Sequence, residues 1–86
     1  MEKIISYDNF IKLGEEQIDE YIIRLHEALN TSDNWIDTYW SLETIIENIK
    51  TGCFDITIDD KNNLFIFGTY VDEINDEVKK ILTGLK

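Results

Sequence analysis

The sequence predicts a small α+β domain in which helices precede a two-stranded antiparallel β-hairpin and a C-terminal helix. Three observations favour this fold class. Apolar residues recur at helical spacing over residues 15–49, alternate with polar residues over 54–58, and return to helical spacing over 74–85. The chain has 86 residues, 43% of them hydrophobic and none of them proline, which is enough to build one core. We therefore expect one domain, residues 1–86, with the order α-α-β-β-α.

The first long helix is expected over residues 15–29. The same spacing continues backwards through Gly14 to Ile4, which leaves two alternatives. Either one long helix crosses Gly14, or an extra short N-terminal helix, capped by Ser6, ends there. An interior glycine costs a helix about 1 kcal/mol relative to alanine, so the break is favoured. The apolar face of the long helix consists of Ile18, Tyr21, Ile22, Leu25, Ala28 and Leu29.

A second helix is expected over residues 35–49, because residues 30–33 are rich in side chains that cap helix N-termini. Gly52 suits the C-terminal end of this helix. Alternatively, Ser41 divides this segment into two shorter helices, and both alternatives stay open. The apolar face consists of Trp35, Ile36, Tyr39, Leu42, Ile45, Ile46 and Ile49.

The predicted hairpin joins a strand at residues 54–58 to a strand at 64–70 through the polar turn 59–63. Asp72 is then expected to cap the last helix. A two-stranded hairpin is marginal by itself, so it must pack on the helices. The last helix buries Ile74, Val78, Ile81, Leu82 and Leu85, and the expected core includes Ile22, Leu25, Ile46 and Phe67.

The formal charge of −10 is concentrated in one region of the chain. Residues 15–60 contain twelve of the 18 acidic residues, but only Arg24 and Lys50 of the eight basic residues. Such a chain is repelled by nucleic-acid phosphates and by anionic membranes, so we expect it to bind neither. The order of helices before a hairpin loosely allows a winged-helix DNA-binding module, but that module needs clustered basic residues.

Three features favour a cytoplasmic protein. The longest run of large apolar side chains, residues 64–67, is far shorter than the roughly 20 residues of a membrane-spanning helix. Residues 1–3 are not followed by the apolar segment of a signal peptide. The single cysteine, Cys53, excludes an internal disulfide and suits a reducing compartment.

The sequence offers little for catalysis, and we expect no enzyme activity, no cofactor and no metal. His26 and Cys53 are too few to bind zinc, and they form the one candidate pair of base and nucleophile. We expect His26 as a boundary residue beside the apolar face of its helix, and Cys53 as an ordinary buried thiol. Residues 59–63 superficially suggest a calcium loop, but Leu64 and Tyr70 stand where an EF-hand needs glycine and glutamate. The glycines are isolated, so there is no phosphate-binding loop.

The predicted helices are unusually acidic. Like charges four residues apart destabilise a helix by a few tenths of a kcal/mol. Such a surface either resembles the anionic pattern of nucleic acid and complements a basic cleft, or serves only to keep the protein soluble. Four like-charged pairs occur: Glu15–Asp19, Glu16–Glu20, Asp33–Asp37 and Glu43–Glu47.

The second predicted helix is also rich in aromatic residues. No single narrow stripe buries Trp35, Tyr39 and Trp40 together with every isoleucine of that helix. Exposed Trp and Tyr are typical of protein-binding hot spots, whereas packing in the core is the simpler alternative. The expected partner-binding residues are Glu16, Asp19, Glu20, Glu27, Asp33, Trp35, Asp37, Trp40, Glu43 and Glu47.

These features predict a non-enzymatic inhibitor that docks its acidic helices on a basic groove of a nucleic-acid-processing protein. In general character the chain resembles the small acidic inhibitors of phages and mobile elements, such as anti-CRISPR proteins and DNA mimics, which act in the cytoplasm of the bacterial host. The resemblance rests on size and charge, and it assigns no role to any residue. Two alternatives remain: an immunity protein or antitoxin that neutralises a nuclease toxin, and a homo-oligomeric or adaptor domain, for example a homodimer.

Overall fold

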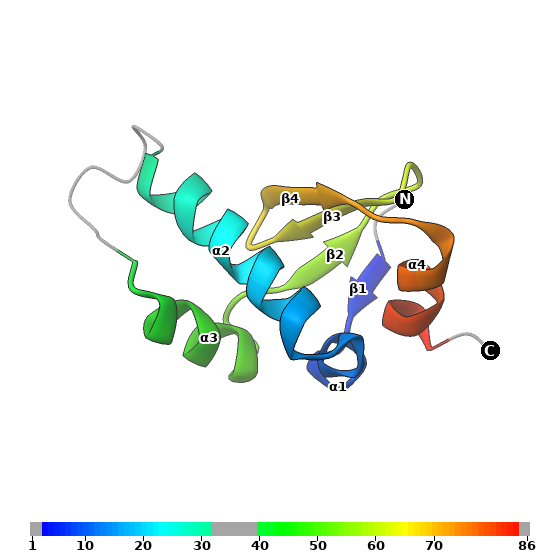
Figure 1. Ribbon diagram of the computed structural model, residues 1–86, viewed down its shortest axis with the longest axis horizontal. Coiled ribbons are helices and arrows are strands. Elements are labelled where there is room, and N and C mark those ends of the chain that lie inside the picture. The colour runs from blue at the N-terminus through cyan, green and yellow to red at the C-terminus, as the bar shows by residue number, and fades with distance from the viewer. Residues whose placement is uncertain (1–2, 32–39, 85–86) are drawn as a thin grey trace.

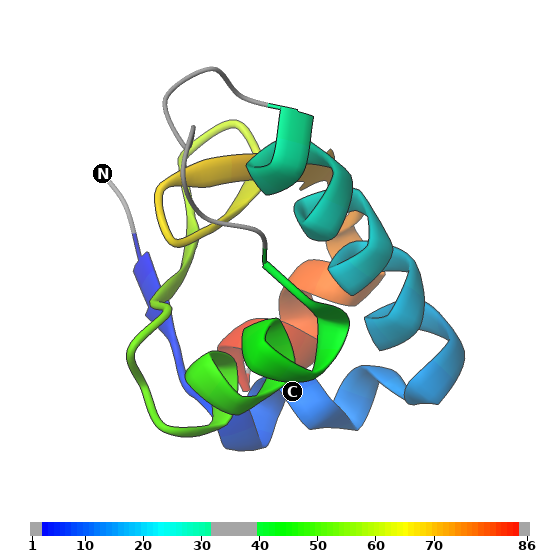
Figure 2. The ribbon, with the colours of Figure 1, turned by 90° about the vertical axis from the view of Figure 1, so that its left-hand side faces the viewer.

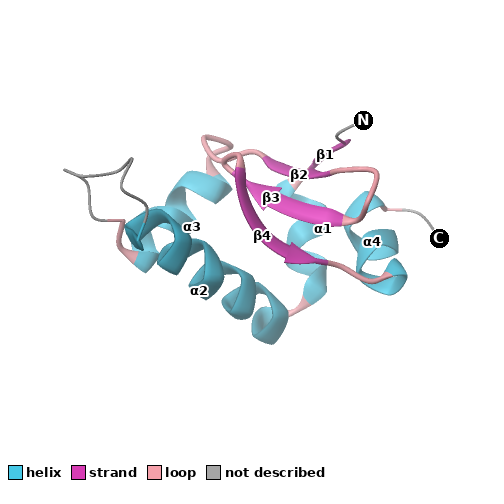
Figure 3. Ribbon diagram, turned by 90° about the horizontal axis from the view of Figure 1, so that it is seen from above, coloured by secondary structure: helices cyan, strands magenta, loops and turns pink. Residues whose placement is uncertain are grey.

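The computed structural model describes residues 3–31 and 40–84, which form helices packed on an antiparallel sheet (Figure 1). The helices gather on one side of the sheet (Figures 2 and 3). The α+β class is therefore confirmed. The elements are β1 (Lys3–Ile5), α1 (Tyr7–Phe10), the 3-10 turn η1 (Ile11–Leu13), α2 (Glu15–Thr31), α3 (Leu42–Lys50), β2 (Ile56–Ile58), β3 (Asn63–Ile66), β4 (Thr69–Glu73) and α4 (Asp76–Thr83).

The sheet has four strands in the order β1-β2-β3-β4, so the prediction of a two-stranded hairpin was wrong. One added strand is β1, in which Ile4 pairs with Thr57 of β2. The other results from the predicted strand 64–70, which is two strands joined by a turn at Phe67 and Gly68. Both turn residues have left-handed backbone angles, with φ of 54° and 72°. This reverses the chain and lets β4 pair with β3.

The β2–β3 connection is a polar turn, as predicted. The Asp59 carboxylate accepts hydrogen bonds from the backbone N–H groups of Lys61 and Asn63, each at 2.9 Å. Its second oxygen accepts a bond of 3.0 Å from the Asn63 side chain. The bonds from Asn63 are the main reason that the pKa of Asp59 lies below its ordinary value.

The chain breaks at Gly14, so the second alternative for the N-terminal segment is confirmed. Ser6 caps α1 by accepting a hydrogen bond of 3.3 Å from the backbone N–H of Asn9. Gly14 then adopts φ 92° and ψ 155°, a conformation essentially restricted to glycine. The 3-10 turn therefore ends there, and α2 begins at Glu15.

Ser41 begins a separate helix, α3, by accepting a hydrogen bond of 3.2 Å from the backbone N–H of Thr44. The predicted helix is thus confirmed from Leu42 onward, and Gly52 follows its end with φ 80°. The Asn30 side chain connects α2 to the segment before α3. It donates to the Trp40 carbonyl at 2.9 Å and accepts from the Trp40 N–H at 2.8 Å. Residues 35–39 of the predicted helix lie outside the described residues.

The last helix is capped by Asn75 rather than by Asp72. The Asn75 side chain accepts a hydrogen bond of 2.8 Å from the backbone N–H of Val78. Asp72 belongs to β4, where it pairs with Leu64 of β3 and forms an ion pair with Arg24. The strand that follows the Phe67 turn thus occupies residues that the sequence pattern assigned to the helix cap.

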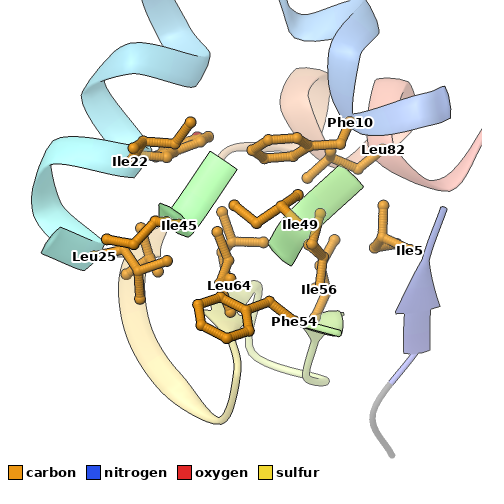
Figure 4. Packing of buried hydrophobic residues seen from close by; sticks show 14 of the residues in the cluster. Ile5, Phe10, Ile22, Leu25, Ile45, Ile49, Phe54, Ile56, Leu64 and Leu82 are labelled. Atoms are coloured by element: carbon orange, nitrogen blue, oxygen red, sulfur yellow. The ribbon is translucent and has the colours of Figure 1, made fainter. Parts of the chain in front are cut away.

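The core lies between the sheet and the helices (Figure 4). Ile22 and Leu25 are buried as predicted, and Ile46 is half-buried. Phe67 is 36% exposed, so its prediction as a core residue was wrong; the side chain stands at the β3–β4 turn. The helices of the described residues include none long and apolar enough to cross a membrane. The labelled core residues are Ile5, Phe10, Ile22, Leu25, Ile45, Ile49, Phe54, Ile56, Leu64 and Leu82.

Candidate functional site

The acids of α2 form an exposed stripe on the side of the helix opposite the core. Glu16, Glu20 and Glu27 are all exposed, whereas Leu25 and Leu29 are fully buried. This division follows from the helical spacing of the apolar residues, which directs one side of α2 toward the sheet. The structure thus keeps these three predicted residues accessible to a partner.

Arg24 interrupts the stripe and links α2 to the sheet. Its guanidinium contacts Glu20 at 2.7 Å and Asp72 of β4 at 2.7 Å. Asp72 is the main reason that the pKa of Arg24 is raised. Burial, followed by the charges of Asp72 and Glu20, raises the pKa of the neighbouring Tyr21 phenol. Glu20 therefore has a structural partner within the protein as well as an exposed position.

Further exposed acids lie on α3, which packs beside α2 (Figures 1 and 2). Glu43 and Glu47 are exposed on α3, and Asp19 lies on the side of α2 that turns toward it. We call the exposed acids of these two helices the acidic face. It consists of Glu15, Glu16, Asp19, Glu20, Glu27, Glu43 and Glu47.

A small apolar groove opens between α1 with η1, α2 and α3. We call it the helical groove; its volume is about 90 Å³. Asp19 contributes the one carboxylate of its lining, and Ile11 at its mouth is 45% exposed. Figure 4 shows Phe10, Ile22 and Ile49 converging from three different helices. The lining residues are Tyr7, Phe10, Ile11, Ile18, Asp19, Ile22, Ile46 and Ile49.

Sequence reasoning missed the helical groove because three separate elements create it. The available signal was a surplus of apolar residues. Ile11, Ile18 and Ile46 continue the apolar faces of their helices, yet none of them is fully buried. Their incomplete burial becomes visible only after the helices are packed.

The aromatic cluster is a packed edge of the core. Trp40 is half-buried, and its ring meets Phe54 edge-on at 5.3 Å and Phe67 at 6.4 Å. Phe54 and Phe67 stack at 4.2 Å with an interplanar angle of 13°. These contacts support the packing alternative for Trp40. The other predicted residues Asp33, Trp35 and Asp37 lie outside the described residues.

Phe67 is an exposed aromatic that sequence reasoning did not select as a site residue. A bulky side chain is uncommon at positive φ, where Asn and Gly are preferred. The stacking on Phe54 contributes to holding the residue in this conformation.

The two residues considered for nucleophilic catalysis lie on different elements: His26 on α2, and Cys53 after the end of α3. Cys53 is exposed, so its prediction as a buried thiol was wrong, and its sulfur accepts a hydrogen bond of 3.4 Å from the Thr51 hydroxyl. His26 is half-buried on α2, as expected for a boundary residue. Within residues 3–31 and 40–84, no group of three or more His, Cys, Asp or Glu side chains is arranged to hold a metal ion.

Comparison with models of protein families, with curated proteins and with solved structures finds no match for this chain. Its function must therefore be inferred from the acidic face and the helical groove.

Proposed function

We propose that the protein is a non-enzymatic inhibitor that docks its acidic face on a basic surface of a nucleic-acid-processing protein. One observation supports this most strongly: α2 and α3 expose seven acids and contain only two cations, Arg24 and Lys50. Arg24 is already held by Glu20 and Asp72, so it adds little positive potential for a partner. Opposite potentials of this kind steer association and exclude wrongly charged partners.

Two biological settings use this chemistry. A phage protein of the anti-CRISPR or DNA-mimic type would occupy the basic surface that binds nucleic acid. An immunity protein or antitoxin would cover the basic cleft of a nuclease toxin. Both settings require the same accessible acids and a cytoplasmic partner, and the identity of the captured protein separates them.

The test is affinity capture from bacterial lysate with two variants of equal charge. The face variant replaces Glu27, Glu43 and Glu47 with lysine. The control variant replaces Asp55, Glu73 and Glu77 with lysine, and these acids are also exposed but lie outside α2 and α3. Each variant changes one acid in the first turn of a helix, so the loss of favourable helix-dipole interaction is matched.

We expect the wild type and the control variant to retain a nucleic-acid-binding protein that elutes as salt is raised, because salt screens the exposed charges. The face variant should lose it while keeping a wild-type circular dichroism spectrum. The proposal would be contradicted if the face variant and the control variant retained this nucleic-acid-binding protein equally.

A homo-oligomer is the second candidate, and the outer side of the sheet favours it. Ile4, Thr57, Phe65 and Tyr70 are register partners across all four strands. Ile4 and Tyr70 are 72% and 53% exposed, which gives an apolar row on this side. Light scattering decides between the candidates: a stable dimer that Tyr70→Lys dissociates favours assembly, whereas a monomeric mass favours the inhibitor.

A further inference from the structure

The helical groove differs from the rest of the acidic face because it is apolar. Ile18 and Ile22 of α2 face Ile46 and Ile49 of α3 across it, and Phe10 of α1 contributes to its lining. Water gains few hydrogen bonds from such a lining, so an apolar group that displaces this water loses little. The groove is therefore suited to an apolar group rather than to an ion or a sugar.

The size of the groove limits what can enter it. An engineered apolar cavity of about 150 Å³ holds one benzene molecule. The helical groove, at about 90 Å³, is smaller but open to the surface at Ile11. It therefore accommodates one aliphatic side chain from a larger partner, with the rest of the partner lying outside.

The charges around the groove determine which residues of the partner can flank that side chain. Asp19 lines the groove, and Glu15 lies one helical turn before it on α2. On α3, Glu43 lies one turn before the lining residue Ile46 and Lys50 one turn after it, while Lys12 follows Ile11. The three acids outnumber these two cations, so an apolar residue flanked by Lys or Arg is favoured over one flanked by Asp or Glu.

We propose that the helical groove receives one aliphatic anchor side chain from a basic amphipathic helix of the protein partner. The proposal deepens the proposed function and rests on it, since it adds an apolar anchor site that Asp19 of the acidic face also lines. A helix laid across a groove between two helices is a common mode of recognition, in which apolar anchors bind and flanking charges set specificity. Buried anchors surrounded by charged rims dominate the energetics of many protein interfaces.

The test uses three synthetic helical peptides of identical length with the full chain. The first has a central Leu flanked by Lys, the second has Ala in place of that Leu, and the third has Glu in place of the Lys residues. Binding is followed by fluorescence anisotropy and by amide chemical shifts in the protein. We expect the first peptide to bind and to shift residues of α1, α2 and α3 around the groove. The second should bind at least about tenfold more weakly, in line with the loss of a buried anchor.

Two variants locate the anchor. Ile46→Phe adds bulk to the groove lining, and Ile4→Phe makes the same change at an exposed position of β1, away from the acidic face. We expect Ile46→Phe to reduce binding of the first peptide to the level of the second, while Ile4→Phe binds as the wild type does. Asp19→Asn, a milder change that keeps the side-chain shape, should lower affinity for the first peptide and weaken its salt dependence.

Absence of binding by the first peptide, equal binding of the first two peptides, or no effect of Ile46→Phe would each overturn the proposal. Its failure is distinguishable from failure of the proposed function. One outcome is that the Glu27, Glu43 and Glu47 reversals abolish partner capture while Ile46→Phe changes neither capture nor peptide binding. The proposed function is then supported and the anchor proposal is wrong. The opposite outcome is that Ile46→Phe abolishes the binding that depends on the central Leu of the first peptide, while those reversals leave partner capture unchanged. The groove then binds an aliphatic side chain, and the proposed function is wrong.

Discussion

Arg24 interrupts the acidic stripe of α2, but both of its ion pairs are formed within the protein. In the sequence it interrupts an acidic stripe, which suggests a partly neutral surface. In the structure it forms ion pairs with Glu20 of α2 and Asp72 of β4, and the second of these links the helix to the sheet. Exposed ion pairs contribute little to stability on average, but this one has two carboxylates and joins two elements. The position of Asp72 in a strand, which the sequence pattern did not predict, is what makes the contact possible.

The buried and exposed sides of α2 predict different effects of truncation. Leu25→Ala should lower the free energy of unfolding by about 2–5 kcal/mol, because Leu25 is fully buried and its loss leaves a cavity. Ile23→Ala is the matched control on the same helix, where the side chain is 51% exposed, and should lower the free energy of unfolding by less than about 1 kcal/mol. Chemical denaturation measures both. Similar losses for the two variants would contradict the assigned orientation of α2.

At the scale of elements, the sequence predicted the helices better than the strands. The apolar spacing of α2 and α4 spans several turns, and the Ser6 and Ser41 caps are visible in the sequence. By contrast, β1 has three residues, too few to show alternation. The two strands β3 and β4 merged into one prediction because Phe67 occupies a left-handed turn position that Asn or Gly usually marks.

Substitution of Gly14 tests the break between η1 and α2. The sign of the change in the free energy of unfolding distinguishes a broken helix from a continuous one. In a continuous helix, Gly14→Ala would stabilise the protein by about 1 kcal/mol. In this structure the residue has φ 92° and ψ 155°, so alanine should destabilise it by about 1–3 kcal/mol. Apart from the two adjacent residues, no atom of the described part of the chain lies within 4 Å of an added Cβ, so the expected loss comes from backbone strain. Thermal or chemical unfolding gives the sign, and a stabilised variant would contradict the break.

At the scale of the whole molecule, the sequence predicted the charge imbalance but not how the acids and the apolar groove are arranged in space. Helical spacing predicted that the acids of α2 share one side of the helix. It did not predict that α3 packs beside α2, nor that Ile11, Ile18 and Ile46 leave an apolar groove between the acids of the two helices. Such features depend on contacts between residues distant in the chain. The structure therefore changes a general statement about acidity into exposed acids on two packed helices, with an apolar groove that Asp19 also lines.

The most direct test of the acidic face is the association rate of the captured partner with the wild type, the face variant and the control variant. Electrostatic steering raises association rates well above the roughly 10⁵–10⁶ M⁻¹s⁻¹ of unsteered pairs and is lost at high salt. We expect the wild type and the control variant to associate rapidly at low salt and at least about tenfold more slowly at high salt, as screening shortens the reach of the charges. The face variant, with lysine at Glu27, Glu43 and Glu47, should associate slowly at both. Equal rates for the face and control variants, or rates that do not change with salt, would contradict the account.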